Sequence, residues 1–389
     1  MSRDAAIVSL RGAKRWQQGH PWIFRSDVSQ PPLGAAGAVR VRDVRGHALG
    51  WALWSPGSEI SLRLIDGDPD AVIDGAWWHA RLEQALARRA PLASQTNACR
   101  LVHGEGDGLP SLVVDRFDRW LVVQLLSAGL EAYRTEIVDA LRSITGAEGA
   151  LARNDAALRD REGLPRGVEP LWGTVPDEIE VLEHGVRYLA APRTGQKTGA
   201  FLDQREARVL VGGVAHGRAL DLFSYHGSFA LHLARRADAV TAVDSSGPAL
   251  ARAAQNATLN GFTNVTCAEA DAFEFLREAL RNGERYDTIV VDPPAFAKNR
   301  PSLPAAVRAY RDINLHAMKL LTPGGILYSA SCSYHLTKPL FWEMLQDAAA
   351  GAGRRMVLRS LTGQPLDHPE VLTIPETGYL KGALLEAAD

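Results

Sequence analysis

The stretch ALDLFSYHGSFALHLARRADAVTAVD, residues 219–244, decides the fold of this chain. An apolar run that contains Asp221 is followed by a turn with Gly227, an amphipathic segment and a second apolar run that ends at Asp244. A strand, a helix and a strand in succession form a crossover between two parallel strands. The stretch therefore predicts the first unit of a parallel sheet that helices cover.

The same alternation continues along the chain to residue 331. Helical patterns at 248–260, 272–282 and 310–321 separate the apolar runs. Strict alternation of strands and helices predicts an α/β fold with a doubly wound, Rossmann-like sheet. The predicted strands are residues 219–223, 239–244, 264–271, 286–292 and 325–331.

Two further regions precede this sheet, so the sequence predicts three domains. Residues 1–70 carry short β runs that turns interrupt, which predicts a small β-rich domain. Residues 71–190 mix helical and strand patterns and include a hairpin that turns at His184-Gly185, which predicts an α+β domain. The alternating sheet occupies a third domain, residues 191–389.

Composition excludes several classes of protein. With 389 residues, 46% apolar and 23% charged, the chain resembles ordinary globular proteins rather than fibrous or disordered ones. The three cysteines are too few and too scattered to indicate a disulfide framework or a metal site. The segment MSRDAAIVSLRGAKR lacks the apolar run of a secretory signal, and no run is long enough to span a membrane. We therefore expect a cytoplasmic protein.

Acidic residues near the predicted strand ends indicate a ligand at the carboxyl edge of the sheet. Asp244 can accept hydrogen bonds from both hydroxyls of a ribose, and Asp271 with Ala272 suits an adenine. The loop at 224–228 has one glycine and lacks the G-x-G-x-x-G pattern of a dinucleotide site. An adenosine cofactor without phosphate, S-adenosylmethionine (SAM), fits better. The alternative is that Asp221, Asp244, Asp271 and Asp292 are ordinary caps.

A stiff loop, Asp292-Pro293-Pro294-Ala295-Phe296, follows the fourth predicted strand. Because proline fixes φ and removes a donor, Asp292 and nearby carbonyls would face a substrate in a fixed geometry. Phe296 offers a flat surface on which a base can stack. The loop resembles the (D/N)PP(Y/F/W) loops of class I methyltransferases that act on nucleic-acid bases or amides. The alternative is a rigid turn without a ligand.

Cys332 lies just beyond the fifth predicted strand, whereas Cys99 and Cys267 lie within apolar strand patterns that predict inert core thiols. Carbon 5 of cytosine needs a thiolate added at carbon 6 before it can attack a methyl sulfonium, whereas methylation of a ring nitrogen needs no cysteine. A nucleophilic Cys332 would therefore indicate cytosine C5 methylation. The alternative is that Cys332 is simply a small, buried hydrophobic residue.

The N-terminal region is basic although the chain as a whole has a net charge of −2. Residues 1–65 hold nine Lys and Arg and four acids, with Trp16, Trp22 and Phe24 interleaved among them. Basic and aromatic residues in this pattern favour contact with RNA, and the alternative is an ordinary solvated face.

Motifs along nearly the whole chain resemble one family, the PUA-domain-containing class I SAM-dependent methyltransferases that form 5-methylcytosine in bacterial 23S ribosomal RNA. They occur in the family's order. The motifs are GHPWIFRSDV (19–28), RLVHGEGDGLPSLVVDRF (100–117), RND with REGL (153–164), GQKTGAFLDQR (195–205), DLFSYHGSFA (221–230), NATLNG (256–261), DPPAF (292–296), YRDINLHAMKLLTPGGIL (310–327), SCS (331–333) and DHPEVLTIPETGYLKG (367–382).

The resemblance implies roles for individual residues. Cys332 would be the nucleophile, and Asp292 or a water would remove the proton from carbon 5. Pro293 and Phe296 would contact the target base. The basic residues Lys14, Arg15 and Arg25 of the PUA domain would bind 23S rRNA. The residues that would bind SAM are Lys197, Thr198, Phe201, Asp203, Gln204, Arg205, Phe223, Ser224, Tyr225, Gly227, Asp244, Ser245, Asp271, Ala272 and Asp292.

The sequence departs from the family at one loop and leaves other questions open. His226-Gly227-Ser228 follows Tyr225 where relatives often have Thr-Gly-Gly, so we expect a differently shaped methionine loop. A methyltransferase for another base, such as guanine N7, and a non-catalytic RNA-binding factor that contains SAM are the alternative functions. The sequence also leaves a homodimer open.

Overall fold

The computed structural model describes residues 5–297 and 299–389. Contacts divide the chain into two compact units. The first comprises the residues up to Val181 together with Ala190–Leu202 and Leu366–Thr377, and the second comprises Leu182–Leu189, Asp203–Pro365 and Gly378–Asp389. The predicted boundary near residue 70 falls inside the first unit, and the three-domain division stays a prediction.

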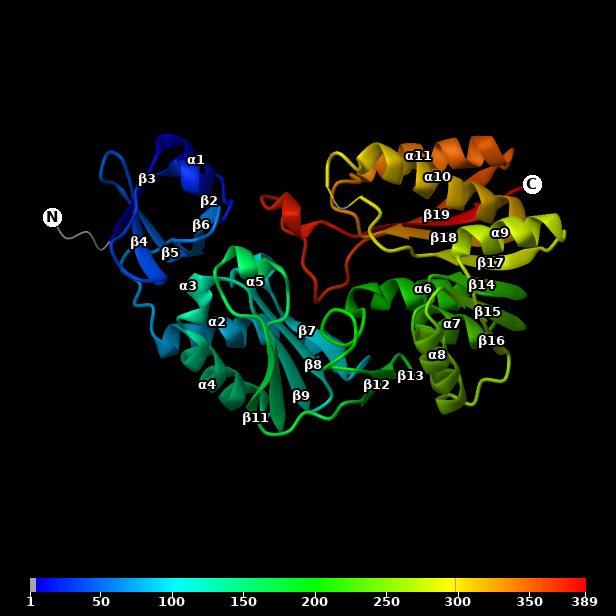
Figure 1. Cartoon of the computed structure of the whole chain (residues 1–389), viewed down its shortest axis with the longest axis horizontal. Coiled ribbons are helices and arrows are strands. Elements are labelled where there is room, and N and C mark those ends of the chain that lie inside the picture. Colours follow the sequence, from blue (N-terminus) through cyan, green and yellow to red (C-terminus); the bar gives the residue numbers. More distant parts are fainter. Residues whose placement is uncertain (1–4, 298) are drawn as a thin grey trace. The chain divides into compact units, whose positions relative to one another are not determined.

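The first unit begins with a six-stranded sheet (Figure 1). Strand β1 pairs in parallel with β4, and the other neighbouring pairs are antiparallel. The order is β2–β6–β5–β4–β1–β3. The strands are β1 (Ala5–Val8), β2 (Trp22–Phe24), β3 (Val28–Gln30), β4 (Gly37–Asp43), β5 (Ala48–Trp54) and β6 (Ile60–Asp66).

Helix α1 (Leu10–Gln17) packs beside this sheet. Ser9 begins the helix because its hydroxyl accepts the N–H of Gly12 at 3.1 Å, which satisfies one of the unpaired donors of the first turn. Ala13 and Trp16 are buried, whereas Arg11 and Lys14 are exposed. The helix therefore presents a basic face to solvent.

A five-stranded sheet forms the rest of the first unit, in the order β11–β10–β9–β8–β7. Trp78 and Leu82 of α2 and Ile137 of α4 belong to the core that covers it. The strands are β7 (Ala98–His103), β8 (Leu112–Phe117), β9 (Trp120–Leu125), β10 (Gly149–Arg153) and β11 (Val168–Trp172), and the helices are α2 (Gly75–Ala87), α3 (Ala128–Glu131), α4 (Arg134–Thr145) and α5 (Leu158–Arg161).

Strands β12 (Ile179–Glu183) and β13 (Val186–Ala190) form the predicted hairpin. Its two turn residues, His184 and Gly185, have φ of 49° and 83°. Two consecutive residues with positive φ characterise the tight turns whose twist matches antiparallel strands. The hairpin predicted at His184-Gly185 is therefore confirmed.

The second unit contains a seven-stranded sheet in the order β16–β15–β14–β17–β18–β20–β19. The first five strands are parallel, and β20 and β19 add antiparallel pairs. The predicted α/β, Rossmann-like sheet is confirmed. The strands are β14 (Arg218–Leu222), β15 (Ala239–Asp244), β16 (Val265–Glu269), β17 (Tyr286–Val291), β18 (Leu321–Ser331), β19 (Met356–Thr362) and β20 (Lys381–Ala387).

Helices cover both faces of this sheet (Figure 1). Helices α9, α10 and α11 pack over one face, and α6, α7 and α8 lie over the other. Their bounds are α6 (Arg205–Val214), α7 (Ser228–Ala234), α8 (Gly247–Leu259), α9 (Ala272–Arg281), α10 (Leu303–Leu320) and α11 (Lys338–Ala352).

A buried ion pair joins β12 to this helical layer. Glu183 accepts from Nε and Nη2 of Arg208 on α6 at 2.7 and 2.6 Å, and His232 on α7 lies 3.1 Å from the same carboxylate. Glu183 is fully buried. The Arg208 guanidinium holds the pKa of Glu183 below its usual range although burial opposes this. The carboxylate therefore stays charged and fixes the hairpin to α6 and α7.

We expect Glu183→Gln to lower the free energy of unfolding by about 3–5 kcal/mol, because the change removes the carboxylate that binds the buried Arg208 guanidinium. Urea unfolding at pH 7 measures the loss. Glu274→Gln is the matched control, since Glu274 is 67% exposed beside Arg277. The control is expected to change stability by less than about 1 kcal/mol. Equal effects of the two substitutions would contradict the prediction.

Candidate active site

The carboxyl edge of the seven-stranded sheet gathers the loops that carry the predicted site. Strand β14 pairs with β15 on one side and with β17 on the other, so the direction of winding reverses at β14. Ligands of open α/β sheets bind beside such a reversal. The loops that meet here begin at Phe223, Ser245, Asp292 and Cys332.

The loop after β14 is wound tightly. Phe223 and Tyr225 have φ of 59° and 49°, and Gly227 has φ of 82°. A left-handed backbone conformation is uncommon at non-glycine residues, and residues that adopt it are often found at functional sites. Packing also requires glycine at position 227. A Cβ there would lie 2.9 Å from Cβ of Ala253, so glycine permits close packing against α8.

Asp244 ends β15 and supports this loop. Its two carboxylate oxygens accept backbone N–H groups from Tyr225 and Ser246, each at 2.9 Å. A carboxylate has about four acceptor positions, so two bonds leave capacity for the hydroxyls of a ribose. Ser245, beside it in the chain, is exposed. The predicted role of Asp244 agrees with this geometry and stays a prediction.

Two further acids of the predicted series have structural partners. Asp271 is the N-cap of α9, and its Oδ1 accepts the N–H groups of Phe273 and Glu274. Ala272, which follows Asp271, is buried in the core. Asp221 lies inside β14 rather than at its end, and it accepts the N–H of Ala230 at 2.9 Å. Asp271 therefore caps a helix, and its contact with the cofactor stays a prediction.

The segment at the start of α6 meets the loop after β17. Nε2 of Gln204 donates to Oδ1 of Asp292 at 2.9 Å, and Asp203 accepts the hydroxyl of Tyr379 at 2.8 Å. Arg205, the first residue of α6, is fully buried. Residues separated by about ninety positions in the sequence are thus brought together.

The predicted cofactor residues Lys197, Thr198 and Phe201 belong to the first unit. The Lys197 ammonium lies 4.5 Å from the centre of the Phe201 ring. Thr198 donates to Asp115, whose carboxylate also accepts from Arg100. These contacts fix the local shape of the segment, and its place at the cofactor stays a prediction.

An aromatic group connects two loops and two helices of the site. The ring of Phe296 lies 6.3 Å from that of Phe223, 6.1 Å from that of Phe273 and 4.7 Å from that of Tyr310. Pro293 is buried and Phe296 is half-buried. Part of the Phe296 ring therefore packs within the protein, and its contact with a base stays a prediction.

The turn that carries Cys332 is held by Tyr310 of α10. Ser331 donates to the Tyr310 hydroxyl at 3.0 Å, and Ser333 Oγ lies 2.9 Å from the same oxygen. Cys332, between these two serines, is half-buried. Sequence reasoning missed Tyr310, and its only sequence signal was the YRDIN motif.

The three cysteines differ in exposure. Cys99 is buried, as predicted for a core thiol. The same prediction is wrong for Cys267, which is exposed. The reason is that β16 is an edge strand of the seven-stranded sheet, so the helices leave much of it uncovered.

Two buried polar atoms in the cofactor region fit a bound polar ligand. Ser224 Oγ and Gln204 Oε1 have no hydrogen-bond partner among the residues that the structure describes. Buried polar atoms are costly to leave unpaired, so such atoms commonly face a ligand or an ordered water. SAM carries amino, carboxylate and hydroxyl groups that can supply partners, and the residues present therefore fit it.

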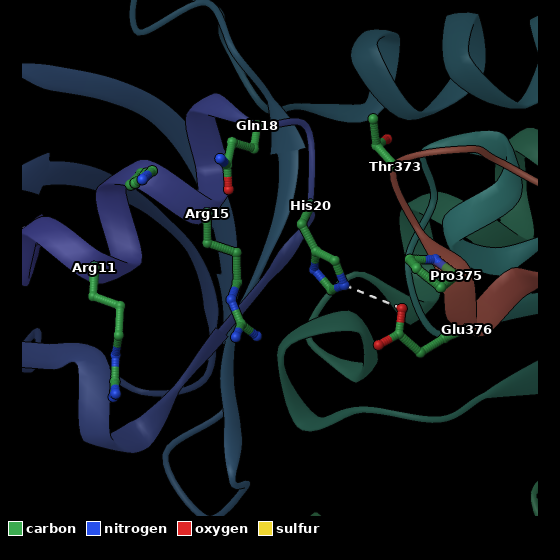
Figure 2. A pocket seen from close by; sticks show the side chains of 8 residues that line it. Arg11, Arg15, Gln18, His20, Thr373, Pro375 and Glu376 are labelled. Carbon is green, nitrogen blue, oxygen red and sulfur yellow. Dashed lines mark hydrogen bonds and ion pairs between the residues drawn. The ribbon is translucent and has the colours of Figure 1, made fainter. Parts of the chain in front are cut away.

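A second candidate surface lies in the first unit, along α1. Arg11, Lys14, Arg15 and His20, together with Thr373 and Glu376, line a pocket of about 570 Å³. The side chains of Arg11 and Arg15 extend to the same side of α1, and His20 lies 3.1 Å from Glu376 (Figure 2). Figure 2 also shows that residues 373–376 form the opposite wall.

Partners already engage some of the predicted RNA-binding residues. Arg25 donates to the carbonyl of Gly57 at 2.6 Å, and the Arg15 guanidinium lies 4.7 Å from the centre of the Phe24 ring. Trp16 is a core residue rather than an exposed aromatic. Lys14 has no ion-pair partner among the residues that the structure describes. Lys14 and Arg15 therefore keep their charge available to a phosphate.

Two family models match the chain. Residues 99–375 match S-adenosylmethionine-dependent methyltransferases, and residues 7–66 match the PUA-like domain. The predicted cofactor, SAM, is confirmed by the first match, and the predicted β-rich N-terminal domain agrees with the second.

Relatives with the printed name Ribosomal RNA large subunit methyltransferase I match nearly the full length. The protein of Klebsiella pneumoniae strain 342 is 40% identical over 93% of both chains, and that of Salmonella typhi is 39% identical over 97% of this chain and 96% of its own. A protein described as a putative SAM-dependent methyltransferase from Streptococcus mutans has a TM-score of 0.83 at 22% identity, covering 98% of this chain and all of its own. A putative methyltransferase complexed with SAH reaches 0.85 at 23% identity, with the same coverage. The two structures support the fold.

Among the described residues, no helix is long and apolar enough to cross a membrane. No group of three or more His, Cys, Asp or Glu side chains among them is arranged to hold a metal ion.

Asp221 should make stability depend on pH. Burial, with the nearby charges of Asp292 and Asp244, raises the pKa of Asp221 well above 3.8. The pKa of Asp221 is higher in the folded protein than in the unfolded chain, so folding is favoured at low pH, where the carboxyl is neutral. This contribution to stability is lost as the pH rises from about 4 through the pKa of the folded protein. We expect Asp221→Asn to gain stability relative to the wild type between pH 5 and pH 8, by up to about 1.4 kcal/mol per pH unit. Urea unfolding at several pH values measures this, and a pH-independent difference would contradict it.

Proposed function

This chain belongs to the family of S-adenosylmethionine-dependent methyltransferases, and we propose that it forms 5-methylcytosine in 23S ribosomal RNA. The observation that carries the proposal is Cys332, placed after β18 and next in the sheet to the Asp292 loop after β17. Its near full-length likeness to Ribosomal RNA large subunit methyltransferase I of Klebsiella pneumoniae supports the substrate class.

The thiol of Cys332 supports cytosine carbon 5 as the target. In the proposed reaction the Cys332 thiolate bonds to carbon 6, and the electrons of the C5–C6 double bond make carbon 5 nucleophilic. SAM, when bound, supplies an electrophilic methyl group. Removal of the proton from carbon 5 then restores the double bond, and the thiolate leaves carbon 6 with its electron pair.

Asp292 is our candidate for proton removal, either directly or through a water. Gln204 holds one of its carboxylate oxygens, and the two prolines that follow limit the motion of the loop. Asp292 follows β17 and Cys332 follows the neighbouring strand β18, so we propose that both groups contact the same base. Pro293 and Phe296 would then form the contact surface for that base.

The alternatives lack a comparable observation. Methylation of guanine N7 needs no thiol, so that function would not explain why a cysteine lies between the two serines that Tyr310 contacts. A non-catalytic RNA-binding factor gives no reason for Asp292 and Cys332 on neighbouring strands. Neither the relatives nor the single chain described here supports a homodimer, so the proposal is written for one chain.

The basic face of α1 is the proposed contact for the RNA backbone. Lys14 and Arg15 lie in the last turn of the helix, beside the pocket that faces Glu376. Cations bind phosphates and release counterions, which gives affinity without a particular sequence. The base would then be selected at the second unit rather than here.

Product analysis tests the reaction. We incubate the protein with methyl-tritiated SAM and 23S rRNA, digest the RNA and identify the labelled nucleoside. The expected label is in 5-methylcytosine. Cys332→Ala should bind SAM normally and lose methylation by roughly 10³-fold or more, because it lacks the nucleophile.

Cys267→Ala is the matched control for that variant. Cys267 is also an accessible thiol, on the edge strand β16, and its loss should leave the rate unchanged. Label in another nucleoside would refute the proposed product. A normal rate in Cys332→Ala would refute the covalent mechanism.

Salt dependence tests the RNA contact. If Lys14 and Arg15 each neutralise one phosphate, the double change to alanine should reduce the slope of log K against log salt by about 1.4. Filter binding at several salt concentrations measures this slope. The variant Arg142→Ala/Arg281→Ala removes the same charge elsewhere and serves as control. Equal slopes in both variants would exclude the α1 contact.

A further inference from the structure

A buried lysine stands beside the turn that carries Cys332. Lys381, the first residue of β20, is only 4% exposed. Strand β20 runs antiparallel to β18, and Lys381 pairs with Ser331. Because β20 is antiparallel, its first residue lies at the edge where β18 ends, and the next residue of that chain is Cys332.

The Lys381 ammonium is oriented by backbone groups. Its Nζ donates to the carbonyl of Ser333 at 2.6 Å and to the carbonyl of Tyr379 at 2.9 Å. Both acceptors are backbone carbonyl oxygens, and the two bonds fix the position of the ammonium. Cys332 therefore lies between Ser331, which pairs with Lys381, and Ser333, which binds its ammonium.

The other ionisable groups around the turn come from several elements. Tyr310 of α10 bonds to both serines. Asp292 follows β17, and Asp203 precedes α6 and binds the Tyr379 hydroxyl. His335 follows the turn in the chain.

The charges of these groups do not all have the same effect on a thiolate at Cys332. Burial raises the pKa of Tyr310, so its phenol is neutral near pH 7, and the negative charge of Cys332 raises it further. Cys332 lies in the chain between the two serines that the Tyr310 hydroxyl contacts. The carboxylates Asp292 and Asp203 disfavour a second negative charge nearby, whereas Lys381 favours it.

We propose that Lys381 is a positioning residue that holds the Ser331–Ser333 turn and stabilises the thiolate form of Cys332. A thiol becomes nucleophilic as the thiolate, and a cation that binds the same turn in a site of low dielectric favours that form. The importance of this thiolate for catalysis rests on the proposed function, but the effect on the thiol itself does not.

Thiol titration tests the proposal directly. We measure the rate at which iodoacetamide alkylates Cys332 from pH 5 to pH 10, following the Cys332 peptide of the full chain by mass spectrometry. The wild-type thiol is expected to titrate below about 8.5, the ordinary value. In Lys381→Met the midpoint should rise by about one pH unit or more, whereas Lys381→Arg should stay near the wild type.

Three outcomes would overturn the proposal. A wild-type midpoint at or above about 8.5 does so even if no variant folds. An unchanged midpoint in a folded Lys381→Met protein means that Lys381 has only a structural role, whatever happens to activity. A midpoint that rises as far in Lys381→Arg as in Lys381→Met means that the positive charge at position 381 is not what lowers the midpoint of the thiol.

The product assay separates this proposal from the proposed function. If the midpoint shifts as expected but the labelled nucleoside is not 5-methylcytosine, the proposed function fails and the role of Lys381 stands. If the product is 5-methylcytosine and the midpoint does not shift, the proposed function stands and the role of Lys381 fails. Thermal unfolding of each variant confirms that the comparison is made between folded proteins.

Discussion

The pairing of β18 with β20, in which Ser331 lies opposite Lys381, is the constraint on which the candidate active site depends. Parallel strands alone bring the ends of β15, β17 and β18 to one edge of the sheet. An antiparallel strand is needed to bring the start of another segment to the same edge. The chain meets this need by passing through residues 366–377 of the first unit before it returns as β20. The cation beside Cys332 is a consequence of that path.

Hydrogen bonds hold the reactive groups from outside the site. Gln204 fixes Asp292, Tyr310 fixes the serines beside Cys332, and backbone amides fix Asp244. Each support comes from a different element, so the geometry depends on the packing of the whole second unit. The buried pair of Glu183 and Arg208 ties the hairpin into that packing. Preorganisation of this kind is typical of sites that hold catalytic groups in a fixed geometry.

Much of the fold could be predicted from the sequence because alternating strands and helices have distinct periods. The five parallel strands and the hairpin at His184-Gly185 follow from local pattern and turn chemistry. The pairing of strands β19 and β20 could not be predicted in this way, because no local sequence pattern indicates an antiparallel strand added at the edge of a sheet. The same limit explains Cys267, whose apolar neighbours suggested burial although β16 is an edge strand.

The sequence by itself determined which chemical groups the protein has. The glycine-poor loop, the Asp-Pro-Pro loop and a cysteine beyond the fifth strand each follow from residue type and spacing, and the basic charge of the N-terminal region is a matter of counting. Only the tertiary structure decided which of these groups are neighbours. Lys381 stands 49 positions from Cys332, and no local rule places a lysine beside a thiol. Strand register does so, because hydrogen bonds between β18 and β20 align residues that the chain itself keeps far apart.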